Sequence, residues 1–145
     1  PETIVSPVAA AIAKIAHQHD VLFAAREVVV LGHGRLVGKP AALWAMRQGA
    51  KVTVLTKESS DITVAIAKAD ILILGAGNAH MITPDMIKEG VVIFDAATSE
   101  DGGELAGDAH PDCAQKASLM TPVPGGIGPI TIAMLLQNVI ARITA

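Results

Sequence analysis

Apolar runs and amphipathic stretches alternate along this chain. Runs rich in Val, Ile and Leu that end at a small residue are typical of buried parallel strands, and they cover residues 27–31, 51–56, 70–74, 91–95 and, more briefly, 119–121. Between them, apolar positions recur at helical spacing and predict helices over residues 6–19, 40–48, 62–69, 83–90 and 132–143. Ser6 and Asp61 are the expected caps of two of these helices. The alternation predicts one α/β domain of three layers, a right-handed, doubly wound parallel sheet with helices on both faces.

A glycine-rich loop is expected directly after the first strand. Residues 32–38 read Gly-His-Gly-Arg-Leu-Val-Gly, with glycines at the first, third and seventh positions. Gly32 and Gly34 would let the chain turn tightly and bring bare backbone up to a pyrophosphate, and Gly38 would let the next helix pack closely on the strand. This context between a strand and a helix favours a dinucleotide-binding loop of the Rossmann type, and plain packing of the loop is the alternative.

The residues that follow the other strands suit the rest of a dinucleotide. Lys57 follows the second strand, and with His33 and Arg35 it would accommodate the 2′-phosphate of NADP, whereas an inward Glu58 would oppose that charge. A solvated surface lysine is the alternative interpretation of Lys57. The small residues after the third and fourth strands would leave room for a ribose or a flat ring, or would only pack a tight loop; they are Gly75, Ala76 and Gly77, then Ala96, Ala97 and Thr98.

Proline and glycine dominate residues 121–131, which read Thr-Pro-Val-Pro-Gly-Gly-Ile-Gly-Pro-Ile-Thr before the last predicted helix. Proline fixes φ, and glycine permits close approach of a ligand to backbone N–H groups. We therefore expect one fixed loop shape at a helix start, where an anion or a cofactor is favoured. A rigid connector between strand and helix is the alternative.

Composition excludes several function classes. With 145 residues, 51% of them hydrophobic, the chain has enough apolar material for one core. Its net charge is −3, it has no tyrosine, and its aromatic residues are two Phe and one Trp, so the basic patch and stacking surface of a nucleic-acid-binding protein are missing. We also expect no membrane association, because no apolar run looks long enough to cross a bilayer.

The cysteine content and the N-terminal residues indicate where in the cell the protein is located and whether the chain is a whole protein. Cys113 is the only cysteine, so a disulfide or a Cys-based metal site within the chain is excluded and no metal site is expected. Residues 1–3 lack the features of a signal peptide. A reducing, cytoplasmic location is expected, and the missing initiating Met suggests a piece of a longer protein.

Three segments resemble one known family. They are Gly32 with residues 37–40, then Gly107 with Asp108, and the long stretch 121–134. They are similar to the Gly-Arg-Ser-x-x-Val-Gly-x-Pro, Gly-Asp-Val and Thr-Pro-Val-Pro-Gly-Gly-Val-Gly-Pro-Met-Thr-x-Ala-Met segments of the bifunctional methylenetetrahydrofolate dehydrogenase/cyclohydrolase family, in its C-terminal NAD(P)-binding domain. The resemblance extends from residue 6 to about residue 140, with Ser6-Pro7 where the family has Thr-Pro at its domain crossover.

The resemblance implies an oxidoreductase half-site with NADP, or alternatively NAD, as cofactor. The family's enzymes transfer hydride from 5,10-methylenetetrahydrofolate and then hydrolyse the methenyl product. Their catalytic Tyr and Lys lie in an N-terminal folate domain, so no catalytic residue is expected in this tyrosine-free chain, which would be inactive alone. The implied partners are its own N-terminal folate domain, the tetrahydrofolate substrate and a second copy in a homodimer.

The resemblance also implies site residues. The cofactor-binding set is Gly32, His33, Gly34, Lys57, Gly75, Gly77, Thr98 and Thr131, and the substrate cleft is Pro124, Gly125 and Gly126. His33 and Gly34 stand where the family has Arg and Ser, so the usual bidentate clamp on a 2′-phosphate is missing and Lys57 supplies one cation in its place. The alternatives are a non-catalytic nucleotide-sensing or interaction module and another Rossmann dehydrogenase without its substrate domain.

Overall fold

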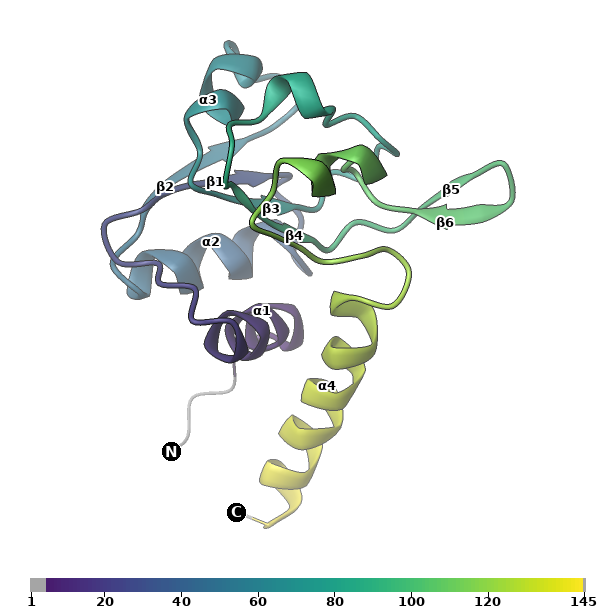
Figure 1. Cartoon of the computed structure of the whole chain (residues 1–145). Helices are drawn as coiled ribbons and strands as arrows, with labels where there is room; N and C mark the ends of the chain where they lie inside the picture. The colour runs from purple at the N-terminus through teal and green to yellow at the C-terminus, as the bar shows by residue number, and fades with distance from the viewer. Residues whose placement is uncertain (1–4, 145) are drawn as a thin grey trace.

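The computed structural model describes residues 5–144 and has a five-stranded parallel sheet at its centre (Figure 1). Its order is β2-β1-β3-β4-β7, with β1 (Glu27–Leu31), β2 (Lys51–Leu55), β3 (Ile71–Leu74), β4 (Val92–Asp95) and β7 (Leu119–Met120). The helices are α1 (Pro7–Gln18), α2 (Gly38–Arg47), α3 (Ile62–Lys68) and α4 (Ile127–Thr144), with 3₁₀ turns η1 (Pro84–Met86) and η2 (Pro111–Gln115). Residues 1–3, in which the sequence analysis finds no features of a signal peptide, lie outside the described residues.

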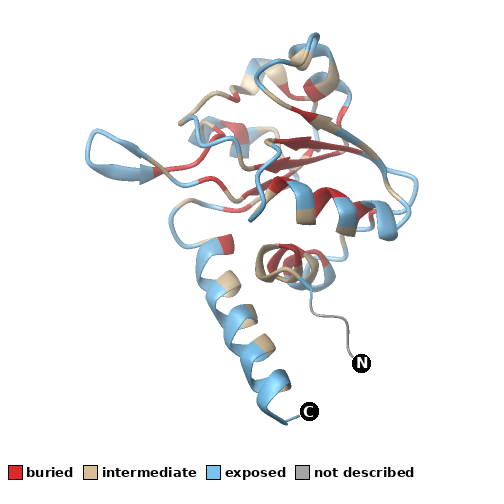
Figure 2. Ribbon diagram, turned by 180° about the vertical axis from the view of Figure 1, so that it is seen from behind, coloured by how far each residue is buried: buried red, intermediate tan, exposed pale blue. Residues whose placement is uncertain are grey.

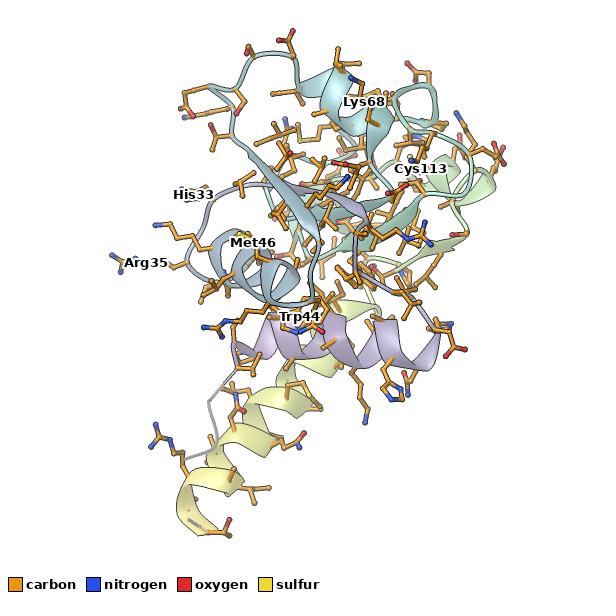
Figure 3. The ribbon with its side chains drawn as sticks, turned by 90° about the vertical axis from the view of Figure 1, so that its left-hand side faces the viewer. His33, Arg35, Trp44, Met46, Lys68 and Cys113 are labelled. Atoms are coloured by element: carbon orange, nitrogen blue, oxygen red, sulfur yellow. The ribbon has the colours of Figure 1, made fainter. Side chains whose placement is uncertain are left out.

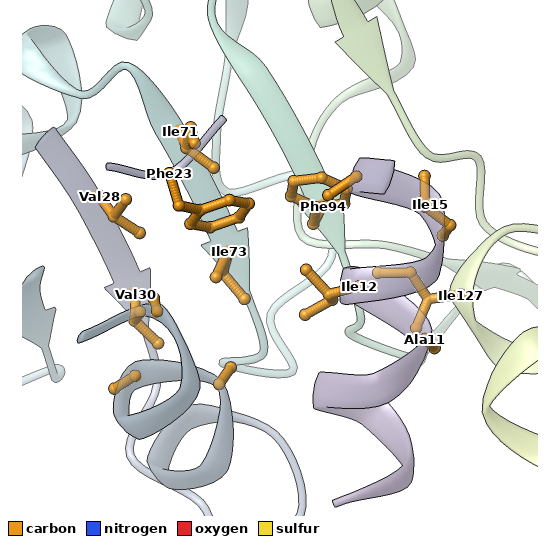
Figure 4. Packing of buried hydrophobic residues seen from close by; sticks show 14 residues of the cluster. Ala11, Ile12, Ile15, Phe23, Val28, Val30, Ile71, Ile73, Phe94 and Ile127 are labelled. Carbon is orange, nitrogen blue, oxygen red and sulfur yellow. The ribbon is translucent and has the colours of Figure 1, made fainter. Parts of the chain in front are cut away.

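The central strands bury both of their faces, one against each helix layer. Val28 and Val30 of β1 belong to the cluster formed with α1 and α2, whereas Val29 and Leu31 belong to the cluster formed with α3. Successive side chains of a strand face opposite sides, so a sheet covered on both faces needs runs without polar positions. Figure 4 shows the first cluster, and Figure 2 shows the buried residues gathered on the sheet and its facing helices. The expected three-layer, doubly wound α/β fold is confirmed.

The strand order reverses at β1, which places the candidate loops together. Leu31, at the end of β1, pairs with Leu55 of β2 on one side and with Leu74 of β3 on the other, and Leu74 pairs with Asp95 of β4. Because these pairs are parallel, the loops after all four strands leave the sheet at the same edge. In open α/β sheets, ligands bind at this edge where the strand order reverses.

Several predicted helix boundaries are wrong. α4 begins at Ile127 rather than at residue 132, so Thr131 lies within it. Glycine and proline are tolerated there because the first N–H groups of a helix have no intrahelical acceptor. The segment 83–90 holds only the turn η1, because Ile87 is already extended and buried. Ser6 and Asp61 make no side-chain capping bond, and Asp61 has a left-handed φ of +56°.

An antiparallel hairpin that the sequence analysis missed projects from the sheet (Figure 1). It consists of β5 (Ser99–Asp101) and β6 (Glu104–Ala106). Gly102 and Gly103, where the sequence does predict a turn, have φ values of +59° and +88°. The two strands are short and mostly exposed, so they lack the apolar run that identifies the buried strands.

Helix α4 leaves the sheet and packs beside α1 (Figure 1). Asn138 Nδ2 donates to the carbonyl oxygen of Val5 at 3.0 Å. Large apolar side chains are exposed along the rest of the helix at Ile132, Leu135, Leu136, Val139, Ile140 and Ile143, here called the α4 stripe. With 18 residues and a mean hydropathy of 1.4, α4 has the length and composition of a membrane-spanning helix, so the expectation that no run is long enough is wrong. A helix that packs on another domain has the same properties.

Candidate functional site

The first and last glycines of the loop after β1 are packed against neighbouring backbone. Gly32 has a φ of +104°, and a Cβ added there would lie 2.5 Å from the carbonyl oxygen of Gly75. A Cβ on Gly75 would lie 2.6 Å from Cγ1 of Val37, and one on Gly38 would collide with the carbonyl oxygen of Gly32. The tight turn and the close approach of α2 thus both depend on residues without a side chain.

The middle of the same loop faces open space. A Cβ on Gly34 would have no heavy atom within 4 Å, and the residue is exposed. Figure 3 shows His33 and Arg35 at the outer side of the loop, pointing away from the sheet. A phosphate can approach bare backbone only where such room exists. The loop therefore combines two packed glycines with one that leaves its surface free.

This loop borders a cleft of about 590 Å³, here called the β1 cleft. Its lining includes six residues predicted as cofactor-binding or as setting cofactor preference: Gly32, His33, Gly34, Lys57, Glu58 and Gly75. The side chain of Lys57 is 90% exposed, and its Nζ lies 4.0 Å from Oε1 of Glu58. A lysine so exposed is free to turn toward an anion in the cleft. Gly77, with a φ of +73°, is exposed and does not line this cleft.

A second cleft, of about 420 Å³, lies against the Pro/Gly segment and is here called the α4 cleft. It brings together the remaining predicted residues except Gly77, which are Thr98, Pro124, Gly125, Gly126 and Thr131. The Val123–Pro124 peptide bond is cis, and Gly125 has a φ of +92°. A Cβ on Gly126 would collide with the carbonyl oxygen of Pro122, so the loop can fold this tightly only with glycine there.

The side chain of Thr131, which lines the α4 cleft, has a polar atom without a hydrogen-bond partner in the described part of the chain. Its Oγ1 is buried and has no hydrogen-bond partner among the described residues. A buried hydroxyl without a partner costs free energy, so this oxygen is available to a ligand or a water molecule, as is Oγ of Ser99. That this segment contacts a ligand stays a prediction, and its last residues are helical.

The sequence analysis assigned no role to two carboxylates, those of Asp95 and Asp108, that the structure buries in this region. Asp95 is 2% exposed and Asp108 is fully buried. Asp95 accepts hydrogen bonds from the N–H groups of Ala97 at 3.1 Å and Ala109 at 2.8 Å. Burial raises the pKa of Asp95 and of Asp108, although backbone hydrogen bonds to both carboxyl groups act in the opposite direction. The available signal was an aspartate that closes an otherwise apolar strand.

These features define an α/β domain of the Rossmann type. The sheet order reverses at a glycine-rich loop, and two clefts open where ligands bind in such sheets. In the part of the chain that the structure describes, no group of three His, Cys, Asp or Glu residues could hold a metal ion.

The chain belongs to the tetrahydrofolate dehydrogenase/cyclohydrolase family, whose NAD(P)-binding domain matches residues 6–145. The bifunctional protein FolD of Bacillus licheniformis is 41% identical over 133 residues, which cover 90% of this chain and 47% of that protein. The resemblance inferred from the sequence is thus confirmed, and it replaces the alternative of an unrelated Rossmann dehydrogenase.

Solved structures of the family have the same fold. The bifunctional FolD enzyme of Campylobacter jejuni superposes with a TM-score of 0.87 at 33% identity, covering 90% of this chain and 47% of that one. The Trypanosoma brucei enzyme, complexed with NADP and an inhibitor, gives a TM-score of 0.85 at 33% identity, covering 91% of this chain and 48% of that one. The chain therefore spans about half the length of the relatives it matches.

Proposed function

We propose that this chain binds NADP, with NAD as the alternative, for hydride transfer from 5,10-methylenetetrahydrofolate in a methylenetetrahydrofolate dehydrogenase/methenyltetrahydrofolate cyclohydrolase. The cofactor supplies the nicotinamide ring that accepts the hydride. The observation that carries the proposal is the crowding of Gly32, Gly38 and Gly75 beside an open cleft where the strand order reverses. This geometry lets a pyrophosphate meet bare backbone. The NADP complex of the Trypanosoma brucei relative supports it.

Each cleft takes one half of the cofactor in this proposal. Residues 32–34 and Gly75, which line the β1 cleft, contact the pyrophosphate and ribose together with Gly77 of the exposed loop beside it, and Lys57 contacts the 2′-phosphate. Thr98 and Thr131 lie at the nicotinamide end, where the unpaired Oγ1 of Thr131 would gain a partner. Pro124, Gly125 and Gly126 form the wall that faces the folate. The chain thereby orients the nicotinamide toward the substrate.

We base the proposed preference for NADP over NAD on the charges around the β1 cleft. Lys57, His33 and the acidic Glu58 line the cleft, and Arg35 lies on the outer side of the same loop. An acidic residue that faces the 2′-hydroxyl selects NAD, whereas cations accommodate a 2′-phosphate. Glu58 lies 71% exposed beside Lys57, which partly neutralises it. Lys57 is therefore the residue on which the preference depends most.

Calorimetric titration of the chain with NADP and with NAD tests this assignment. Replacing Lys57 with Ala should weaken NADP binding by about three- to tenfold and leave NAD binding unchanged, because one charge-assisted contact to phosphate is lost. The matched control is Lys51→Ala, since Lys51 begins β2 at the opposite edge of the sheet and pairs with Glu27 at 3.0 Å. Equal weakening of both cofactors by Lys57→Ala would contradict a 2′-phosphate role.

Catalysis requires a further domain in this proposal. The chain contains no tyrosine, and the family's acid/base residues lie in an N-terminal folate domain. The exposed α4 stripe is the surface that this domain would cover, since burying its six large apolar side chains would be strongly favourable. The chain alone would then bind the cofactor without turnover. We further propose that the longer protein is a cytoplasmic homodimer, which sedimentation of that protein would test.

One observation favours a second function, nucleotide sensing without turnover. His33 and Gly34 replace the Arg-Ser pair that the family's loop carries, so the clamp on the 2′-phosphate is altered. An activity assay on the longer protein, which includes the folate domain, distinguishes the two functions. Formation of NADPH from NADP and 5,10-methylenetetrahydrofolate supports the dehydrogenase, and cofactor binding without this reaction supports the sensing module.

A further inference from the structure

Asp108 lies beneath the loop that follows β3. Its Oδ2 accepts a hydrogen bond from the N–H of Ala76, and its Oδ1 accepts one from the N–H of Asn78, both at 2.7 Å. The N–H of Gly77 also interacts with this carboxyl group. One fully buried side chain therefore accepts hydrogen bonds from two backbone N–H groups of this loop and interacts with the N–H between them.

The loop that Asp108 binds, residues 75–78, forms one wall of the β1 cleft. Gly75, Ala76 and Asn78 all line that cleft. The last sheet bond before the loop runs from the N–H of Gly75 to the carbonyl oxygen of Leu31 at 2.9 Å. After Gly75, the backbone N–H groups of Ala76 and Asn78 donate to the side chain of Asp108 instead of to a neighbouring strand. Ala76 and Asn78 are exposed residues, but their N–H groups point at the buried carboxylate of Asp108, so we expect this conformation of the loop to depend on the two bonds.

Asp108 is itself fixed by two neighbouring segments. Its carbonyl oxygen accepts from the N–H of Ile82 at 2.9 Å, and the preceding carbonyl of Gly107 accepts from the N–H of His80 at 3.0 Å. The next N–H, that of Ala109, donates to Oδ2 of Asp95 at 2.8 Å, and Asp95 lines the α4 cleft. The side chain therefore presents its carboxylate to the loop from a rigid position.

We propose that Asp108 is a positioning residue for the nucleotide cofactor, because it holds Gly75–Asn78 as a preformed wall of the β1 cleft. This inference rests on the proposed cofactor site. Asp108 does not touch the ligand; its backbone hydrogen bonds order the loop before binding, so the ligand does not have to order it. A loop ordered in advance binds more tightly because less conformational entropy is lost on association.

The ionisation of Asp108 gives the proposal a pH signature. Burial raises the pKa of Asp108 above its ordinary value. The titratable groups of the segments packed around it include Asp95, whose negative charge repels that of Asp108, and His80, which lies 3.5 Å from Asp101 and has its ring centroid 5.3 Å from that of His110. Protonation of Asp108 converts one acceptor oxygen into a donor facing an N–H. The affinity for the cofactor should therefore fall as the pH drops, starting above the pH at which an exposed aspartate titrates.

The variant Asp108→Asn tests the proposal, with Asp20→Asn as matched control. Asn keeps the shape of Asp but offers one oxygen, so one loop N–H faces an amide NH₂ group. Asp20 is exposed near the opposite edge of the sheet and has a left-handed φ of +54°, which Asn tolerates. By calorimetry we expect Asp108→Asn to weaken binding of NADP by about tenfold and to abolish its low-pH decline, with Asp20→Asn unchanged.

Hydrogen exchange of residues 76–78 is the second measurement, and it needs no cofactor. Faster exchange of these amides in Asp108→Asn, with unchanged exchange in β1 and β3, is the expected result. Equal NADP affinity in the wild type and Asp108→Asn would overturn the proposal, as would unchanged exchange in the loop. If the wild-type chain binds neither cofactor, the proposed function fails, and with it the role for Asp108, even where the exchange result shows that the carboxylate orders the loop.

Discussion

Two glycines in one loop should respond to substitution in opposite ways. Gly34 has free space around the position of a Cβ and a φ outside the left-handed range, whereas Gly32 has a φ of +104° and faces the carbonyl oxygen of Gly75 at 2.5 Å from its Cβ position. Gly34→Val should therefore fill the β1 cleft without disturbing the fold. Gly32→Ala should disturb the fold itself.

The expected magnitudes follow from the local geometry. For Gly32→Ala, an unfavourable φ costs about 1–3 kcal/mol and the enforced backbone displacement about 1–3 kcal/mol, so the free energy of unfolding should fall by about 2–6 kcal/mol. For Gly34→Val, an exposed substitution away from packed atoms should change it by less than about 0.5 kcal/mol. The same Gly34→Val chain should bind NADP at least about tenfold more weakly, because the valine occupies the space of the phosphate.

Urea denaturation followed by circular dichroism measures the free energy of unfolding of each variant, and calorimetry measures the affinity for NADP. Gly34→Ala serves as an intermediate control, since its single methyl group should weaken binding less than valine does. Undiminished NADP affinity in Gly34→Val would refute the assignment of the loop to the pyrophosphate. A Gly32→Ala chain as stable as the wild type would refute the steric argument.

Three further predictions concern the core, a pH dependence and the α4 stripe. Phe94→Ala, at a fully buried position, should lower the free energy of unfolding by about 3–5 kcal/mol in urea denaturation. Lys88 donates to Asp70 at 2.6 Å and thereby lowers the pKa of Asp70, so its stabilisation is present above the ordinary value of 3.8 and is lost as the pH falls through the lower folded value. Because solvent screens this pair, Lys88→Met should cost less than about 1 kcal/mol at neutral pH and flatten the acid limb of the stability curve. Replacing Leu136 and Ile140 with Gln should leave the chain's stability within about 0.5 kcal/mol but weaken its binding to the N-terminal folate domain, measured with that domain expressed separately.

The buried strands could be predicted because each is covered on both faces. Such strands consist of uninterrupted apolar residues, as in Val28–Leu31 and Ile71–Leu74, and the sequence displays them directly. The glycine loop was equally visible, since its position between strand and helix follows from the elements around it. Most of the predicted residues line one of two clefts, and their role in cofactor binding stays a prediction.

The remaining features depend on contacts between distant segments. Gly128 and Pro129 suggested a loop, yet the first turn of a helix accommodates both, so α4 starts earlier than local propensity indicates. The β5–β6 hairpin is polar and exposed, and only its glycine turn is visible in the sequence. Asp108 was visible in the sequence as part of the Gly107-Asp108 segment that resembles the family, but its bonds to Ala76 and Asn78 join positions 32 and 30 residues apart, which no local pattern records.

Mapping amide chemical shifts of the ¹⁵N-labelled chain during titration with NADP tests the central claim most directly. The account predicts changes gathered at the carboxyl edge of the sheet, at residues 32–34, Lys57, Gly75, Thr98 and 125–126. Absence of any change, or changes centred on the opposite edge around Arg26, Lys88 and Ser118, would contradict a cofactor site at the reversal of strand order.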